Sequence, residues 1–464
     1  MGISSLGVGS SVLTQDVLDQ LRAADEAQFV TPVEKRISSE KSKSGALDVL
    51  DALMDNVYGS LKGLTEYGVF EARVATSSNE SIATVSAAAS SDLQDFTLEV
   101  SNLATKEIEQ SDSFNAEDAK IATGSGKFEL AVGTQKYIIN YNDTMTLKEL
   151  KNLINKEAGD SIDATIVQLG DTDFRLMLSS DKTGTGQAIS ITDLGDDAGN
   201  KTLDTALTDN MTNVQTAVDA NFKFNGLNIV RQSNTIDDLL SGVTITLQDA
   251  GKTNVSIKQD RDNIETKINN FIEKYNSAIF QLTEDTKSSQ KVEERGIFSS
   301  DSTVKGMKRD IQNILNTVGG GVGRMQDYGI EVGDDGRLSL DSTKLNEKLD
   351  ENPDNVQAFL AGGTFVKSDG QNVEVDGIFT EMENTFAKYS KYGAVLDDYK
   401  TSIQDRIDSL NTQREKAVAR LDSRYRTLAK QWQAYDLMIS QLNAASSTFI
   451  QMANSLTDAQ NNLK

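Results

Sequence analysis

The C-terminal stretch Leu421–Lys464, LDSRYRTLAKQWQAYDLMISQLNAASSTFIQMANSLTDAQNNLK, decides the expected fold. Apolar side chains recur in it every seven residues, and a second set follows the first by four, which is the a and d pattern of a coiled coil. We predict a self-assembly seam formed by Leu421, Tyr425, Leu428, Trp432, Tyr435, Ile439, Leu442, Phe449 and Leu456. The 71 residues from Ala394 to Lys464 contain neither glycine nor proline, so one helix of about 105 Å can run through them.

The last part of this helix is poor in charge. From Gln433 onward the charged side chains are Asp436, Asp458 and Lys464, and the rest of the polar surface is Ser, Thr, Asn and Gln. Exposed helices usually carry Lys and Glu, whereas the cores of interfaces are depleted in charge. We therefore predict a helix that is buried on several sides in an assembly, with an ordinary coiled-coil tail as the alternative.

The N-terminus has the same character. Asp16 and Asp19 are the charged residues among the first twenty, and the apolar side chains that we assign to an N-terminal assembly helix are Val12, Val17, Leu18 and Leu21. The segment Thr31-Pro-Val-Glu34 has the pattern of a capping box that opens a further helix. The two ends of the chain are therefore expected to be partner helices on either side of a different middle.

The middle, from Glu71 to Lys258, has the period of β-strands. Apolar residues alternate at 96–100, 128–132 and 243–247, and Asn225-Gly226 is a hairpin-turn signal. A capping box at Thr146–Glu149 predicts a short helix, and Thr235–Asp238 predicts a second one. These patterns indicate two small α+β head domains.

The helical period returns after Lys258, with amphipathic segments at 264–282 and 302–318 around a glycine-rich loop at 319–323. The predicted fold is an α+β multidomain chain in which long terminal helices form a coiled-coil or helical-bundle leg and β-rich heads are inserted between them. The predicted parts are an N-terminal assembly helix (1–40), a helical leg (41–70 with 259–395), a β-rich head (71–112 with 221–258), an outer α+β head (113–220) and a C-terminal coiled-coil assembly helix (396–464).

Composition argues against catalysis and against several kinds of partner. The 464 residues include no cysteine and no histidine, which removes the commonest nucleophile, general base and transition-metal ligands. A net charge of −24 argues against nucleic-acid binding, and no apolar stretch is long enough to span a membrane or to act as a cleaved signal. The segment 372–383 has an EF-hand-like spacing, but its first and third positions deviate, so a plain turn before a helix is preferred. We expect no enzyme activity, catalytic residue, cofactor or metal.

Several segments resemble the flagellar filament cap family, also called hook-associated protein 2. The opening Gly2–Ser10 and the helix Asp16–Leu21 are similar to the start of that family. Tyr328–Asp341 with Asn352-Pro353-Asp, and the run Trp432–Asn443, resemble its C-terminal half. The head is similar as well, at 225–229 and 233–243.

The resemblance implies a structural protein at the distal end of the bacterial flagellar filament, where helical legs grip the filament and heads form a plate. It implies an annular homo-oligomer of about five subunits that promotes folding and insertion of exported flagellin. It also implies secretion through the flagellar type III export apparatus, without signal cleavage, and a dedicated export chaperone bound near the C-terminus. The absence of cysteine is compatible with export of an unfolded chain.

Two alternatives stay open from the sequence. Another axial protein, such as flagellin or a hook–filament junction protein, would also pair its terminal helices. A secreted adhesin would use the acidic head to bind a host-surface ligand, a role that could coexist with capping. Closed rings rather than long filaments would distinguish a cap from flagellin.

Overall fold

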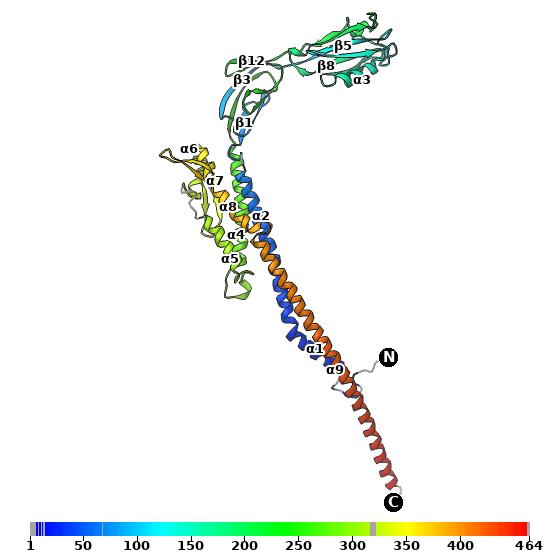
Figure 1. The fold of residues 1–464 in the computed structure, drawn as a ribbon, viewed down its shortest axis with the longest axis vertical. Coiled ribbons are helices and arrows are strands. Elements are labelled where there is room, and N and C mark those ends of the chain that lie inside the picture. The colour runs from blue at the N-terminus through cyan, green and yellow to red at the C-terminus, as the bar shows by residue number, and fades with distance from the viewer. Residues whose placement is uncertain are drawn as a thin grey trace. The chain divides into compact units, whose positions relative to one another are not determined.

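The computed structural model of the protein describes residues 6, 7, 9, 10, 12, 14–66, 68–315 and 322–461 (Figure 1). The chain divides into two compact units. The first joins the N-terminal part up to Glu66 with the chain from Glu265 onward, and the second is Tyr67–Ile264. The predicted fold class, α+β with long terminal helices and β-rich parts inserted between them, is confirmed. The finer division into five parts stays a prediction.

Three long helices form one side of the first unit: α1 (Gln15–Phe29), α2 (Thr31–Thr65) and α9 (Val395–Asn461). Helix α9 runs alongside α2 and then α1 (Figure 1). Helix α2 carries a row of apolar side chains spaced by three and four residues, all fully buried: Leu47, Leu50, Met54, Val57, Leu61 and Leu64. The terminal segments of the sequence are therefore partners, as predicted.

The start of α2 differs from the prediction. Thr31 is not the capping residue; it is the first residue inside the helix, and the cap position is Val30, which makes no side-chain capping bond. The reason is that α1 ends immediately before it. The Val30 amide still donates to the Glu26 carbonyl, while the Val30 carbonyl accepts from the amides of Val33 and Glu34. Backbone hydrogen bonds thus satisfy the first amides of α2, including that of Glu34, which a capping threonine side chain would otherwise accept from.

The rest of the first unit adjoins these long helices through α7 and α8, both of which contact α2. Its helices are α4 (Arg261–Thr286, of which the part from Glu265 belongs here), α5 (Ser302–Leu315), α6 (Ser342–Glu351), α7 (Pro353–Ala361) and α8 (Ile378–Ser390), with short 3-10 turns at Val292–Glu294 and Met325–Tyr328. Its two hairpins are β16 (Ile330–Val332) with β17 (Leu338–Leu340), and β18 (Gly363–Val366) with β19 (Asn372–Val375). Asp341 caps α6, since its carboxylate accepts from the amides of Thr343 and Lys344. Most of the predicted loop at 319–323 lies outside the described residues.

The segment 372–383 is more ordered than the predicted plain turn. Asn372–Val375 is the strand β19, paired with β18, and α8 follows after Gly377. Val375 is buried, so the strand is held by packing as well as by its ladder. The described residues contain no group of three or more carboxylate, histidine or cysteine side chains that could hold a metal ion.

One part of the second unit is a pair of sheets around a common core. A five-stranded sheet has the order β1-β15-β3-β11-β12, and a three-stranded sheet has the order β13-β14-β2. Their strands are β1 (Arg73–Ser77), β2 (Ala83–Ala87), β3 (Gln94–Asn102), β11 (Ala220–Phe224), β12 (Leu227–Arg231), β13 (Thr235–Leu240), β14 (Val243–Leu247) and β15 (Gly251–Gln259). Asn225 and Gly226 both have positive φ in the two-residue turn between β11 and β12, which confirms the predicted hairpin.

The predicted helix at Thr235–Asp238 is wrong, because these residues begin the strand β13. Ile236 pairs with Ile245 of β14, and both side chains are buried in the core between the sheets. The local pattern of a threonine followed by two aspartates favours a helix start, but pairing with a neighbouring strand decides the structure here.

The other part of the second unit contains the sheets β10-β4-β8-β7 and β6-β5-β9 and the helix α3 (Leu147–Ala158). Its strands are β4 (Lys106–Gln110), β5 (Gly126–Val132), β6 (Gln135–Tyr141), β7 (Ile162–Gly170), β8 (Asp173–Thr183), β9 (Ile189–Gly195) and β10 (Thr212–Gln215), with 3-10 turns at Thr185–Gln187 and Thr205–Leu207. The predicted capping box is present: the Glu149 amide donates to Thr146 Oγ1 at 3.3 Å, and the Thr146 amide to Glu149 Oε2 at 3.0 Å. Across the described residues, no helix combines the length and apolarity needed to span a membrane.

Candidate assembly surface

The first part of the predicted seam, from Leu421 to Trp432, packs against the N-terminal part of the same chain. Leu421 and Tyr425 of α9 are buried in a cluster with Leu18 of α1 and Val30. The half-buried side chains that pack around this cluster include Leu428 and Trp432, together with Leu6, Ala417, Val418 and Ala429. The structure therefore brings together four of the predicted seam residues with one of the predicted N-terminal residues.

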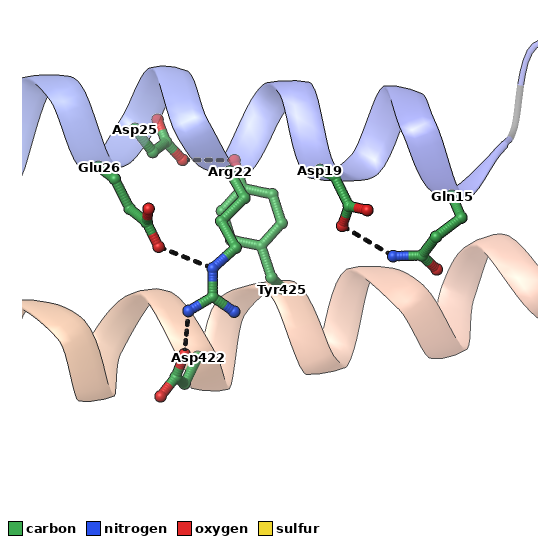
Figure 2. Close-up of polar contacts among 7 residues, drawn as sticks. All are labelled: Gln15, Asp19, Arg22, Asp25, Glu26, Asp422 and Tyr425. Atoms are coloured by element: carbon green, nitrogen blue, oxygen red, sulfur yellow. Dashed lines mark hydrogen bonds and ion pairs between the residues drawn. The ribbon is translucent and has the colours of Figure 1, made fainter.

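Polar contacts tie the same two helices at the edges of this cluster (Figure 2). Arg22 of α1 donates to Glu26 at 2.8 Å and across the pair to Asp422 at 2.5 Å. The Tyr425 hydroxyl donates to Asp25 at 2.7 Å. Desolvation raises the pKa of Tyr425, and this hydrogen bond raises it further, so the hydroxyl stays a donor at neutral pH. The hydrogen bonds to Glu26 and Asp422 raise the pKa of Arg22.

Further along α9 the chain before α1 crosses the helix at Gly9. The Gly9 amide donates to Asp436 Oδ1 at 3.0 Å, and Asn443 Nδ2 donates to the Gly9 carbonyl at 3.2 Å. A Cβ atom at position 9 would lie 2.2 Å from the Asp436 carbonyl oxygen and 2.7 Å from the Ser440 nitrogen. Only glycine allows this backbone to approach the helix so closely. Asp436, charged yet only 5% exposed, therefore anchors the N-terminal segment.

Gly9→Ala is expected to detach this segment from α9, because the added methyl group collides with backbone atoms that cannot move independently of the helix. Hydrogen exchange at the amide of residue 9 should accelerate by at least about tenfold, equivalent to about 1.4 kcal/mol.

The matched control is Gly45→Ala. Gly45 lies within α2, and a Cβ there meets nothing within 4 Å. This variant should keep the exchange rate at Gly9 and raise helix stability by about 0.5–1 kcal/mol. Unchanged protection at position 9 in Gly9→Ala would show that the close approach is not what holds the segment.

The second part of the predicted seam, from Tyr435 to Leu456, is mostly exposed in the described chain. Tyr435, Leu442, Phe449 and Leu456 are 58–72% exposed, although each is a large apolar or aromatic side chain. Ile439 is half-buried. Of the predicted N-terminal residues, Leu18 is buried and Val17 half-buried, whereas Val12 and Leu21 are exposed.

Sequence reasoning missed further apolar side chains on this part of α9. Leu437, Met438, Ile450 and Met452 are also more than half exposed and lie outside the predicted seam. They could have been found by asking which apolar residues of the helix fall outside the heptad positions. Together with the seam residues they give the helix apolar surface on more than one side, which is what a helix surrounded by partners requires. We refer to α9 from Tyr435 to Leu456 as the exposed tail.

Models of one protein family match both ends of the chain. The flagellar hook-associated protein 2 N-terminus matches residues 10–107, and the flagellar hook-associated protein 2 C-terminus matches residues 217–444. The chain belongs to the flagellar hook-associated protein 2 family. Relatives match over nearly the whole length: the A-type flagellar hook-associated protein 2 of Pseudomonas aeruginosa is 27% identical over 97% of each chain, and the flagellar hook-associated protein 2 of Campylobacter jejuni is 22% identical over 99% of each.

A solved structure has the same fold. The D1-D2-D3 domains of the flagellar cap protein from Escherichia coli superpose with a TM-score of 0.60 at 22% identity, covering 77% of this chain and 99% of that one. Membership of the hook-associated protein 2 family confirms the predicted role as a flagellar filament cap at the filament tip, outside the cell. Nothing in these matches favours flagellin, a junction protein or an adhesin.

Proposed function

We propose that this cap protein works as an annular homo-oligomer of about five copies that promotes folding and insertion of exported flagellin, without catalysing a reaction. The observation that carries the proposal is the exposed tail. A helix that is exposed throughout residues 441–458, with large apolar side chains on several sides, is built to be covered by other chains.

The energetics favour assembly of the tail. Fully burying a leucine- or phenylalanine-sized side chain contributes about 1.5–3 kcal/mol, and Leu442, Phe449 and Leu456 are each at least 63% exposed. The tail carries almost no charge that would have to be desolvated: from Leu437 to Asn461, the only charged residue is Asp458. Apolar burial in a ring is therefore not offset by the removal of ions from water.

The same feature bears on export. Before assembly, the exposed tail would present its apolar side chains to solvent inside the cell, where exposed apolar surface promotes aggregation. We therefore propose the tail as the segment that a flagellar export chaperone covers before the chain passes through the type III apparatus. The absence of cysteine means that no disulfide can block passage of the unfolded chain.

The test of the proposed function combines imaging with oligomer analysis. Electron micrographs of filaments labelled for this protein should show label at the tips alone. Light scattering at high concentration, together with cross-linking on filaments, should give a closed species of about five copies. A strictly monomeric protein in both measurements, or label along the filament shaft, would contradict the proposal.

A further inference from the structure

The central part of α9 is basic in a chain whose net charge is −24. Between residues 414 and 430 six basic residues face only two acidic ones, Glu415 and Asp422. The basic residues are Arg414, Lys416, Arg420, Arg424, Arg426 and Lys430. This stretch lies beside α1, the acidic helix of the same pair.

Three of the basic residues form a row along the helix. Lys416, Arg420 and Arg424 are four residues apart and therefore lie on one face. Arg424 pairs with Asp25 at 3.0 Å while remaining 61% exposed. Lys416 and Arg420 are exposed, and within the described part of the chain neither has an ion-pair partner. We refer to Lys416, Arg420 and Arg424 as the basic row.

An acidic groove lies between the same two helices. Asp19 of α1 and Asp422 of α9 line a groove of about 250 Å³. Glu26 is seven residues from Asp19, and Glu415 is seven residues from Asp422, so each extends the acidic line along its own helix. We call these four side chains the acidic groove. Asp19 and Asp422 line the groove itself together with Arg22 and Arg426, and Arg22 pairs with both Asp422 and Glu26. The four carboxylates still exceed the two arginines by two charges.

The row and the groove lie on opposite sides of the buried seam. At 100° per residue, Arg424 is rotated by 100° from the buried Tyr425 in one sense. Asp422, three residues before Tyr425, is rotated by 60° in the other sense. The two surfaces also lie at the same level along the helices, because Arg22 of α1 bonds to Asp422 (Figure 2) and Asp25, three residues further along α1, pairs with Arg424.

We propose that the basic row of one copy docks against the acidic groove of the next copy. The two surfaces are different and complementary, so contact between them gives a head-to-tail interface. Because they lie at the same level along the helices, neighbouring copies can be related by rotation about an axis parallel to the helices, and such an arrangement closes into a ring. The inference rests on the proposed annular assembly. A second copy is a better occupant than a filament subunit, since this chain itself carries both complementary surfaces.

Charge reversal in the full-length protein tests the interface. Lys416→Glu with Arg420→Glu reverses the two members of the row that have no ion-pair partner in the described chain, and Asp19→Lys with Glu415→Lys reverses two of the four carboxylates of the groove. Each double variant alone should associate at least about tenfold more weakly than the wild type in 50 mM salt, by sedimentation velocity. An equimolar mixture of the two should recover association, since each supplies the charge that the other now needs. Wild-type association through this interface should itself weaken in 500 mM salt.

The matched control changes the same amount of charge elsewhere on the first unit. Lys35→Glu with Lys41→Glu alters two exposed lysines of α2 and should associate like the wild type. Helical circular dichroism of all variants should be unchanged, because the substituted side chains are exposed. Equal association of both reversal variants and the control, or absence of recovery in the mixture, would overturn the proposal.

Cross-linking on filaments separates this interface from the proposed function. Because the chain has no cysteine, Asp19→Cys with Arg420→Cys introduces the only two thiols. A short thiol cross-linker should give a ladder of covalent multimers, whereas each single-cysteine variant should not. Capped filaments without a ladder would refute the docking while leaving the capping role intact. Filaments whose tips lack the protein would instead contradict the proposed function. Single-cysteine dimers would indicate a two-fold contact and would also overturn the head-to-tail arrangement.

Discussion

Deletion of Gln433–Lys464 should abolish capping while leaving both compact units folded. The deletion removes the exposed tail, whose large apolar side chains are mostly exposed in the single chain, together with the contacts of Asp436 and Asn443 to Gly9. It spares the buried cluster of Leu18, Leu421 and Tyr425. The truncated protein should therefore melt cooperatively within about 2 °C of the wild type, and cells should release flagellin into the medium. Calorimetry and the flagellin content of culture supernatants measure the two effects.

A single substitution should reproduce the functional loss. Leu442→Asp places a carboxylate in each copy's contribution to a shared apolar surface, where an unpaired charge is costly. The side chain is 63% exposed in the single chain, so monomer stability should not change.

The comparison deletion removes the outer head, from about Asp112 to Ala220. It should lower the efficiency of assembly and alter surface contacts without loss of anchoring. If the tail deletion still caps filaments and the head deletion does not, the anchoring role belongs to the other end of the chain.

Much of the helical architecture could be predicted from periodicity. The run without glycine or proline after Gly393 gives α9 almost to the residue, and the row from Leu47 to Leu64 is the buried face of α2. Such patterns succeed because one side of a long helix must meet apolar partners over many turns. The strands at 96–100, 128–132 and 243–247 were also predictable, since their alternation reflects a buried and an exposed face.

The failures have a common physical origin in contacts between distant segments. Thr235–Asp238 has a helix-start pattern, yet Ile236 is held by Ile245. Thr31 has a capping pattern, yet backbone bonds around Val30 already satisfy the helix start. The heptad pattern continues unchanged after Leu421, so it does not show which part of the helix is covered. The N-terminal segment covers α9 where Leu18 and Gly9 contact it, and the helix beyond these contacts is exposed. A local sequence pattern does not show which distant segment of the chain packs against it.

The two units should unfold as separate cooperative transitions, each sensitive to its own core. Phe271 of α4 is fully buried in the first unit, with its ring 5.2 Å from that of Phe379 and 5.9 Å from that of Tyr275. Phe128 of β5 is fully buried in the second unit, beside Tyr141. Replacing either phenylalanine by alanine removes apolar contacts and leaves a cavity, at a cost of about 3–5 kcal/mol.

Phe271→Ala should therefore lower one calorimetric transition by about 10 °C, and Phe128→Ala should lower the other by a similar amount. Phe280→Ala is the matched control for α4: its ring is 49% exposed beneath Arg337, so its loss should cost no more than about 1 kcal/mol. Tail-dependent capping should survive Phe128→Ala at growth temperatures where the first unit stays folded, because α1 and α9 belong to that unit. A single transition that both core variants lower equally would mean that the leg and the heads share one cooperative fold, and that damage to a head also disturbs the helices that carry the assembly surface.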